Sequence, residues 1–234
     1  MKSPDAPYTY AYPRPAVTTD CVIFGFDEGE LKILLIERST EPYLGRWALP
    51  GGFIRMDEDA ESCARRILKK ETCLENIFME QLYTFSAADR DPRARTISIA
   101  YYALVKLADY KAKAGEDASS VKWFPLSEVP ELAFDHIHIL NTARERLRGK
   151  IRYQPIGFEL LPEKFTLPEL HQLYETVLQT PLDRRNFRKK MLSYGILTDT
   201  NEYQRGARNR APKIYCFDKE RYMELSKEGS YFEV

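Results

Sequence analysis

The sequence predicts a chain of the α/β class with two domains, a larger one over residues 1–150 and a smaller one over residues 163–234. Three observations predict this division. Short apolar and β-branched runs alternate with helical patterns in the first part, as in a two-layer or three-layer α/β domain. Gly and Pro then stand at both ends of residues 149–162, which show no helical period, so we place a linker at residues 151–162. Beyond it, two helical patterns and a hairpin follow in the order of a winged helix-turn-helix.

The composition is that of a globular protein. With 44% hydrophobic and 30% charged residues, the chain is neither collagen-like nor disordered, and its net charge of zero gives it no overall preference for nucleic acid or membrane. The N-terminal arm, residues 1–15, holds four prolines and no apolar core, which excludes a signal peptide and a spanning helix. The four cysteines have no C-x-x-C spacing, so we expect reduced thiols and a cytoplasmic protein.

The elements of the first domain follow this arm. Paired strands are expected at residues 17–26 and 31–37, on either side of an acidic turn that contains glycine. A short strand at 47–53 breaks at a Gly-Gly turn, and an amphipathic helix runs from Glu58 to about Glu71. The remaining elements are expected to be strands at 81–87, 96–107 and 121–124 and a helix from His136 to Arg148, with Asp135 as its candidate cap.

The second domain begins with a helix that Thr166 caps and that carries Pro168 in its first turn. A short turn leads to a second helix from Asp183 to Tyr194, which Gly195 ends. Apolar residues at i, i+4 and i+7 form a stripe that can pack on the first helix, namely Phe187, Met191 and Tyr194. Strands at 196–200 and 213–217 then flank a basic loop, which predicts a hairpin.

Positive charge is concentrated in this second helix and the hairpin. Between Leu182 and Lys213, nine Lys and Arg residues stand against three acidic residues, a local charge of +6 in a neutral chain. Guanidinium groups at the start of such a helix can read base edges in a major groove, and those in a wing can contact phosphates. The pattern therefore predicts binding to double-stranded DNA. The candidate DNA-contacting residues are Arg184, Arg185, Asn186, Arg188 and Lys189 in the helix and Arg205, Arg208 and Arg210 in the loop.

A Gly-Gly turn and the helix that follows it have the spacing of a metal-binding motif. Gly52 is followed after five residues by Glu58 and after seven more by Arg66. Acids at the next position and three and four residues beyond it would lie on one helix face and converge on a divalent cation. In this chain these positions hold Ile67, Lys70 and Glu71. Because two carboxylates are missing and a lysine repels the ion, we expect no metal, no catalytic residue and no cofactor.

Several motifs together are similar to one family of regulators. They are LPGGF with the incomplete metal motif, RDPRAR, LAFDH, RLRGKIRYQPIGFELLP, FTLPELHQLYE and LDRRNFRKKML. The chain resembles the Nudix-related transcriptional regulators (NrtR-like), and the resemblance covers nearly all residues after the arm. It implies an N-terminal Nudix-like α/β/α sandwich with a mixed sheet, which senses a small molecule, and a C-terminal winged helix-turn-helix. It also implies a homodimer that binds an operator, which we expect to be an inverted repeat.

The resemblance leaves the effector open, because ADP-ribose-sensing members stand beside sugar-responsive ones, including arabinose-responsive (AraR-like) regulators. A diphosphate needs the cation that the incomplete motif does not hold, whereas a neutral polyol needs hydroxyl acceptors and an aromatic face. We therefore expect a pentose such as L-arabinose, with ADP-ribose as the alternative. The candidate effector-binding residues are Asp20, Arg38, Gly51, Phe53, Tyr101, Asp135 and His136.

Two other functions stay open at this point. One is a residual Nudix pyrophosphatase whose second domain only dimerises, and the other is a metabolite-binding module with no DNA role. The missing acids argue against the first and the clustered arginines against the second. The charged loop at residues 88–95 is expected near the effector pocket or the dimer contact, and these alternatives stay open. His136 and His138 lack a nearby third ligand, so we expect no metal there.

Overall fold

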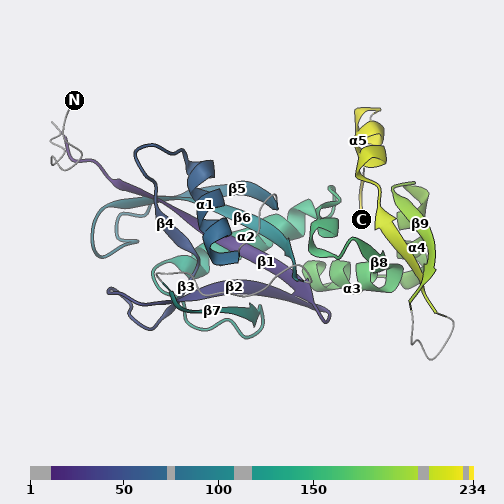
Figure 1. Ribbon diagram of the computed structural model, residues 1–234, viewed down its shortest axis with the longest axis horizontal. Helices are drawn as coiled ribbons and strands as arrows, with labels where there is room; N and C mark the ends of the chain where they lie inside the picture. The colour runs from purple at the N-terminus through teal and green to yellow at the C-terminus, as the bar shows by residue number, and fades with distance from the viewer. Residues whose placement is uncertain (1–11, 73–76, 108–117, 205–210, 229–231) are drawn as a thin grey trace.

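The computed structural model describes residues 12–72, 77–107, 118–204, 211–228 and 232–234, which form two domains side by side (Figure 1). The first domain contains, in chain order, β1 (Ala16–Asp27), β2 (Glu30–Arg38), β3 (Trp47–Ala48), β4 (Gly51–Phe53), α1 (Ala60–Thr72), β5 (Phe78–Phe85), β6 (Thr96–Lys106), β7 (Ala118–Pro125) and α2 (His136–Lys150). The remainder contains the 3-10 helix η2 (Ile156–Leu160), β8 (Lys164–Thr166), α3 (Leu167–Leu178), α4 (Arg184–Ser193), β9 (Leu197–Tyr203), β10 (Lys213–Phe217) and α5 (Lys219–Lys227). Within this described part, no helix has the length and apolarity needed to cross a membrane.

The first domain is built around one mixed sheet of seven strands. Strand β1 is central, because it pairs in parallel with β6 and antiparallel with β2 and β4. The main path of the sheet is β3-β2-β1-β6-β5, and β7 pairs with β2. Alternate residues of β1 face opposite layers, so Cys21 and Ile23 pack with α1 whereas Val22 and Phe24 belong to the core that contains α2. This confirms the predicted α/β/α sandwich with a mixed sheet.

The segment predicted as one strand at 47–53 forms two short strands instead. β3 pairs with β2, and β4 pairs with β1. Pro50 stands between them and has no N–H to give to a ladder, although its carbonyl accepts a hydrogen bond of 2.8 Å from the Cys21 N–H. The break at Pro50 takes the chain from pairing with β2 to pairing with β1.

The second domain is a winged helix-turn-helix, as predicted. Thr166 and Glu169 form a capping box at the start of α3, with the Thr166 N–H donating to Glu169 Oε2 at 2.7 Å. Asp183 caps α4, and β9 and β10 form the hairpin in a three-stranded sheet with order β8-β10-β9. The tip of the hairpin lies outside the described residues, and it carries the predicted DNA contacts Arg205, Arg208 and Arg210.

Much of the segment 151–162, predicted as a linker, is buried, although Arg152, Tyr153 and Pro162 are exposed. Ile156, Phe158 and Leu160 are buried in a hydrophobic cluster that also contains residues of both domains. The Val234 N–H donates to the Arg152 carbonyl at 2.8 Å, and the Phe232 ring lies 5.0 Å from that of Tyr194 at the end of α4. The joint between the domains is therefore held by apolar burial and by backbone hydrogen bonding.

The capping box of α3 gives a stability prediction. Thr166→Ala should lower the free energy of unfolding by about 1 kcal/mol, because the side chain satisfies a backbone N–H at the helix start. Urea denaturation measures the change. Thr142→Ala is the control, since that hydroxyl only donates to the His138 carbonyl within its own helix, and should change stability by less than about 0.5 kcal/mol. Equal losses in both variants would contradict the prediction.

Candidate functional site

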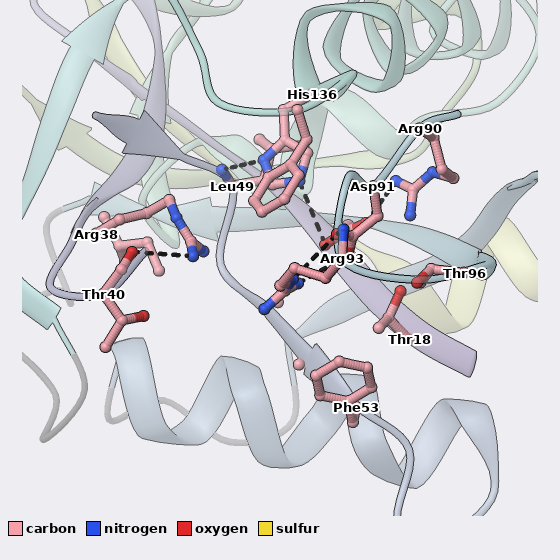
Figure 2. A pocket seen from close by; sticks show the side chains of 15 residues that line it. Thr18, Arg38, Thr40, Leu49, Phe53, Arg90, Asp91, Arg93, Thr96 and His136 are labelled. Atoms are coloured by element: carbon pink, nitrogen blue, oxygen red, sulfur yellow. Dashed lines mark hydrogen bonds and ion pairs between the residues drawn. The ribbon is translucent and has the colours of Figure 1, made fainter. Parts of the chain in front are cut away.

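A cavity of about 300 Å³ opens in the first domain beside the central strands (Figure 2). Strands β1, β2 and β4 supply one part of its wall, and the loop before β6 and the start of α2 supply the rest. Such a volume is at the lower end of small-molecule pockets. Its lining includes Thr18, Asp20, Arg38, Gly51, Phe53, Arg90, Asp91, Arg93, Phe134 and His136.

A buried network of charged side chains forms part of the cavity wall. The Arg90 guanidinium, whose side chain is 4% exposed, donates to both Asp135 oxygens at 2.7 and 2.9 Å. It also donates to Asp20 Oδ2 at 3.2 Å, and the Ser98 hydroxyl donates to the same oxygen at 2.6 Å. The two carboxylates, Asp135 and Asp20, offset the free-energy cost of burying the Arg90 guanidinium. The network therefore fixes the Asp20 carboxylate at the cavity wall.

His136 beside this network is held in one neutral form. The Leu49 N–H donates to its Nδ1 at 2.9 Å, so the proton of the neutral ring sits on Nε2, 3.6 Å from Asp20 Oδ1. Burial lowers the pKa of the ring, although the Asp20 charge acts in the opposite direction. Gly51 is required here, because a Cβ at that position would stand 2.3 Å from Asp20 Oδ1. The cavity thus offers a neutral donor and an acceptor next to each other.

Two further guanidinium groups and two aromatic rings line the cavity. Arg38 donates to the Pro42 carbonyl at 2.8 Å, and its Cζ lies 4.7 Å from the centre of the Phe134 ring. Arg93 is held by Asp91 through hydrogen bonds of 2.8 and 3.0 Å, and lies 5.4 Å from the Phe134 centre and 5.7 Å from that of Phe53. These hydrogen bonds lower the pKa of the Asp91 carboxyl. Fixed cations beside aromatic faces suit an anionic ligand with a planar group.

The helix that follows the Gly-Gly turn does not carry a metal-binding set of residues. The Arg66 guanidinium donates to both Glu58 oxygens, at 2.5 and 2.9 Å, and this lowers the pKa of the Glu58 carboxyl to about 2. Glu58 also accepts the Arg55 N–H, so it braces the loop. Ile67 is 3% exposed and lies under Gly52. With Ile67 and Lys70 at two ligand positions, the donor set does not fit a divalent cation.

Five of the seven predicted effector residues line the cavity, and two do not. Asp20, Arg38, Gly51, Phe53 and His136 line it. Asp135 does not line the cavity but accepts hydrogen bonds from Arg90, which does. The prediction that the Asp135 side chain caps α2 is wrong, because that side chain makes no cap hydrogen bond.

The expected placement of Tyr101 at the cavity is also corrected. Tyr101 pairs in register with Cys21 and packs in the cluster under α1, on the sheet face opposite to Asp20. Sequence reasoning also missed Phe134 and left the loop 88–95 undecided. That loop supplies Arg90, Asp91 and Arg93 to the cavity, and the position of Phe134 directly before Asp135 and His136 was the available signal.

The second predicted surface lies on α4. Phe187 and Met191 are buried, and the Phe187 ring lies 5.1 Å from His171 and 5.3 Å from Tyr174 of α3. The Asn186 N–H is used by the Asp183 cap, at 2.8 Å. Packing of these apolar residues leaves all five predicted DNA-contacting side chains of α4 exposed, namely Arg184, Arg185, Asn186, Arg188 and Lys189.

Comparison with known proteins identifies the family. Residues 14–143 match the model of the NUDIX domain, and residues 157–217 match that of the NrtR DNA-binding winged helix domain. The ADPR responsive transcriptional repressor NtrR of Acinetobacter baylyi is 36% identical over 215 residues, which cover 90% of this chain and 85% of that protein. The chain belongs to the NrtR family. In this NrtR-family chain a Nudix domain is thus joined to a DNA-binding winged helix.

Solved structures agree with this assignment to the NrtR family. Shewanella oneidensis NrtR complexed with a 27mer DNA is 34% identical, with a TM-score of 0.77 over 92% of this chain and 97% of that chain. The NUDIX domain of the same protein complexed with ADP ribose is 38% identical, with a TM-score of 0.54 over 58% of this chain and 91% of that chain. The ADP-ribose pyrophosphatase of Methanocaldococcus jannaschii is 40% identical over 130 residues, 56% of this chain and 73% of that protein. These relatives do not support the arabinose-responsive branch expected from the sequence.

The ion network of the cavity gives a second stability prediction. Asp135→Asn should lower the free energy of unfolding by about 3 kcal/mol, because it removes the charge that accepts two hydrogen bonds from a buried guanidinium. Glu131→Gln is the control: Glu131 pairs with Arg46 but is 81% exposed, so its loss should cost less than about 0.5 kcal/mol. Chemical denaturation compares the two variants. Similar midpoints would show that the network contributes little.

Proposed function

We propose that this protein is a transcriptional repressor whose Nudix domain binds ADP-ribose without a divalent cation and without hydrolysing it. The observation that carries the proposal is the pair of fixed guanidinium groups in the cavity, Arg38 and Arg93. They supply next to the ligand the positive charge that other Nudix domains obtain from a bound cation. ADP-ribose binding by the NUDIX domain of Shewanella oneidensis NrtR supports the same ligand.

ADP-ribose replaces L-arabinose as the preferred effector for a physical reason. The preference for a neutral sugar rested on the missing metal ligands, because a site with Ile67 and Lys70 at those positions does not hold the cation that would neutralise a diphosphate. Arg93, held in the cavity by Asp91, removes this objection. The Phe53 and Phe134 rings offer faces to a planar base, while the Asp20 carboxylate and the His136 Nε2–H offer partners to ribose hydroxyls.

A residual pyrophosphatase is the second candidate function. The 40% identity to an ADP-ribose pyrophosphatase favours it. The sequence of α1 argues against it, because the buried Ile67 and the positively charged Lys70 occupy positions where a metal site needs carboxylates. Release of AMP from ADP-ribose in Mg²⁺ or Mn²⁺, lost in Glu71→Gln, would establish this candidate in place of a pure sensor.

Calorimetry tests the effector assignment. ADP-ribose should bind with the same affinity in Mg²⁺ and in EDTA, and L-arabinose should give no binding heat. Arg93→Ala and Arg38→Ala should each weaken ADP-ribose at least about tenfold, since each removes a charged donor worth roughly 1.4 kcal/mol or more. Arg65→Ala is the matched control, because Arg65 pairs with Glu61 on the outside of α1. Binding that requires Mg²⁺, or a response to L-arabinose alone, would contradict the proposal.

We also propose that α4 reads the operator and that a homodimer places two such helices on an inverted repeat. The exposed basic side chains at the start of α4 support this, as does the DNA complex of Shewanella oneidensis NrtR. One recognition helix per chain and a symmetric dimer fit two half-sites in successive major grooves. The DNA probe is a duplex that the wild-type chain selects from a random-sequence pool.

Arg188→Ala tests the role of α4. If the Arg188 fork contacts a base edge, the variant should bind the selected duplex more weakly by about 1–3 kcal/mol and discriminate less against changed bases. Fluorescence anisotropy at fixed salt measures both quantities. Arg65→Ala in the other domain should leave affinity for the duplex unchanged. Wild-type affinity in Arg188→Ala would remove this residue from the DNA interface.

A further inference from the structure

The strands that form the cavity wall also form the contact with the winged helix. β1 carries Thr18 and Asp20, β2 carries Arg38, and all three residues line the cavity. The turn between the two strands lies at their opposite end, against α3. From Asp20 to Asp27 the strand spans about 23 Å at roughly 3.3 Å per residue. One hairpin therefore reaches from the ligand cavity to the DNA-binding domain.

The tip of this hairpin is seated on α3 by a specific contact. The Thr176 hydroxyl donates to the Gly29 carbonyl at 3.0 Å. The Gln172 side chain covers the same glycine so closely that a Cβ there would stand 2.0 Å from Gln172 Nε2. Gly29 also has a φ of +81°, which favours glycine. Next to it, Leu31 is buried in the same cluster as Leu173 and Val177 of α3.

Helix α3 in turn fixes the turn that begins the recognition helix. Glu175 Oε1 accepts the Leu182 N–H at 2.9 Å, and His171 Nε2 donates to the Leu182 carbonyl at 2.9 Å. Both backbone groups of Leu182 are thereby held by side chains of α3, one residue before the Asp183 cap of α4. In the sequence, His171 immediately precedes Gln172 and Glu175 immediately precedes Thr176.

Backbone pairing holds β1 along its whole length. β1 pairs with β2 from Phe24 to Asp27, with β4 from Thr18 to Asp20, and with β6 from Ala16 to Phe26. We expect a displacement at the cavity end of a strand held in this way to reach the tip, because close-packed interiors transmit strain. Coupling between sites travels through packed elements of this kind.

We infer that the β1–β2 hairpin carries the effect of the ligand from the cavity to the recognition helix, and that Thr176 and Gln172 are the positioning residues at its contact with α3. The inference rests on the proposed function and names the route of its regulation. A ligand that binds Arg38 and Asp20 favours one position of the hairpin. The Gly29 contact then transfers this preference to α3 and, through Leu182, to the orientation of α4. By linkage, DNA bound to α4 changes ligand affinity by the same factor.

The test measures coupling separately from binding. For the wild type, Thr176→Val and Gln172→Ala, anisotropy gives the Kd for the selected duplex with and without saturating ADP-ribose, and calorimetry gives the Kd for ADP-ribose alone. Both variants should bind ADP-ribose as the wild type does, since neither residue lines the cavity. In the wild type, the duplex Kd with ADP-ribose divided by the duplex Kd without it gives the coupling factor. In Thr176→Val this factor should be smaller by roughly fivefold, or should reach one if the wild-type factor is below about five, because one hydrogen bond is worth about that much. Thr180→Val is the control, since its hydroxyl only donates to the Leu178 carbonyl.

The outcomes separate the inference from the proposed function. A wild-type chain that binds no ADP-ribose, or whose duplex affinity does not respond to it, overturns both. A responsive wild type together with full responses in Thr176→Val and Gln172→Ala overturns the hairpin route alone. If either variant has a changed thermal midpoint, the calorimetric Kd for ADP-ribose with and without duplex gives the same coupling factor on folded protein. An unchanged factor in that measurement counts equally against the route.

Discussion

The pairing of β1 on both of its edges is the constraint on which the rest of the structure depends. Its parallel register with β6 and its antiparallel registers with β2 and β4 fix which residues face each layer. Asp20 is thereby directed to the cavity and Cys21 to α1, while the far end of the strand delivers Gly29 to α3. A shift of one residue would exchange the two faces and bring the apolar Cys21 to the ion network. The ligand cavity and the interdomain contact are thus settled by one set of backbone hydrogen bonds.

Under the proposed function, the guanidinium groups of Arg38 and Arg93 take the place of a bound divalent cation in this Nudix domain. A divalent cation serves an enzyme because it activates water and stabilises the charge that develops in the transition state. A sensor needs only to hold its ligand, and guanidinium groups do this with defined geometry at every pH of interest. Arg93 is fixed by Asp91, and Arg38 by the carbonyls of Pro42 and Thr40. Under the proposed function, Ile67 and Lys70 at the acidic positions would remove the metal chemistry from the site, while Arg38 and Arg93 would still attract an anion.

The elements that the sequence predicted are those with strong local signals. The paired strands β1 and β2, the helix α1 and the capped helices α3 and α4 were predicted because periodicity and caps are properties of neighbouring residues. β8 has only three residues, and α5 buries none of its described side chains, so neither has a stripe to detect. For the break of the 47–53 segment, the signal was Pro50, which lacks an N–H.

The candidate site was less predictable because its contacts join residues far apart in the chain. Arg90 lies 45 residues from Asp135 and 70 from Asp20, and nothing local indicates that these charges meet. For Tyr101 the register decides which face is reached, and register is a property of two strands rather than of one. Gly51, Phe53 and His136 were found because they belong to motifs whose spacing is itself a signal.

The packed joint between the domains also has a consequence for the spacing between the two half-sites of an operator. Ile156 and Phe158 are core residues, and Val234 is tied to Arg152, so the winged helix is not suspended from a flexible tether. In the proposed homodimer, a joint of this kind would hold the two α4 helices at a set distance and a set angular phase. Since each base pair turns B-DNA by about 34°, inserting or deleting one between the half-sites would rotate one half-site away from its reader. The spacing of the operator then becomes as much a part of its code as its bases.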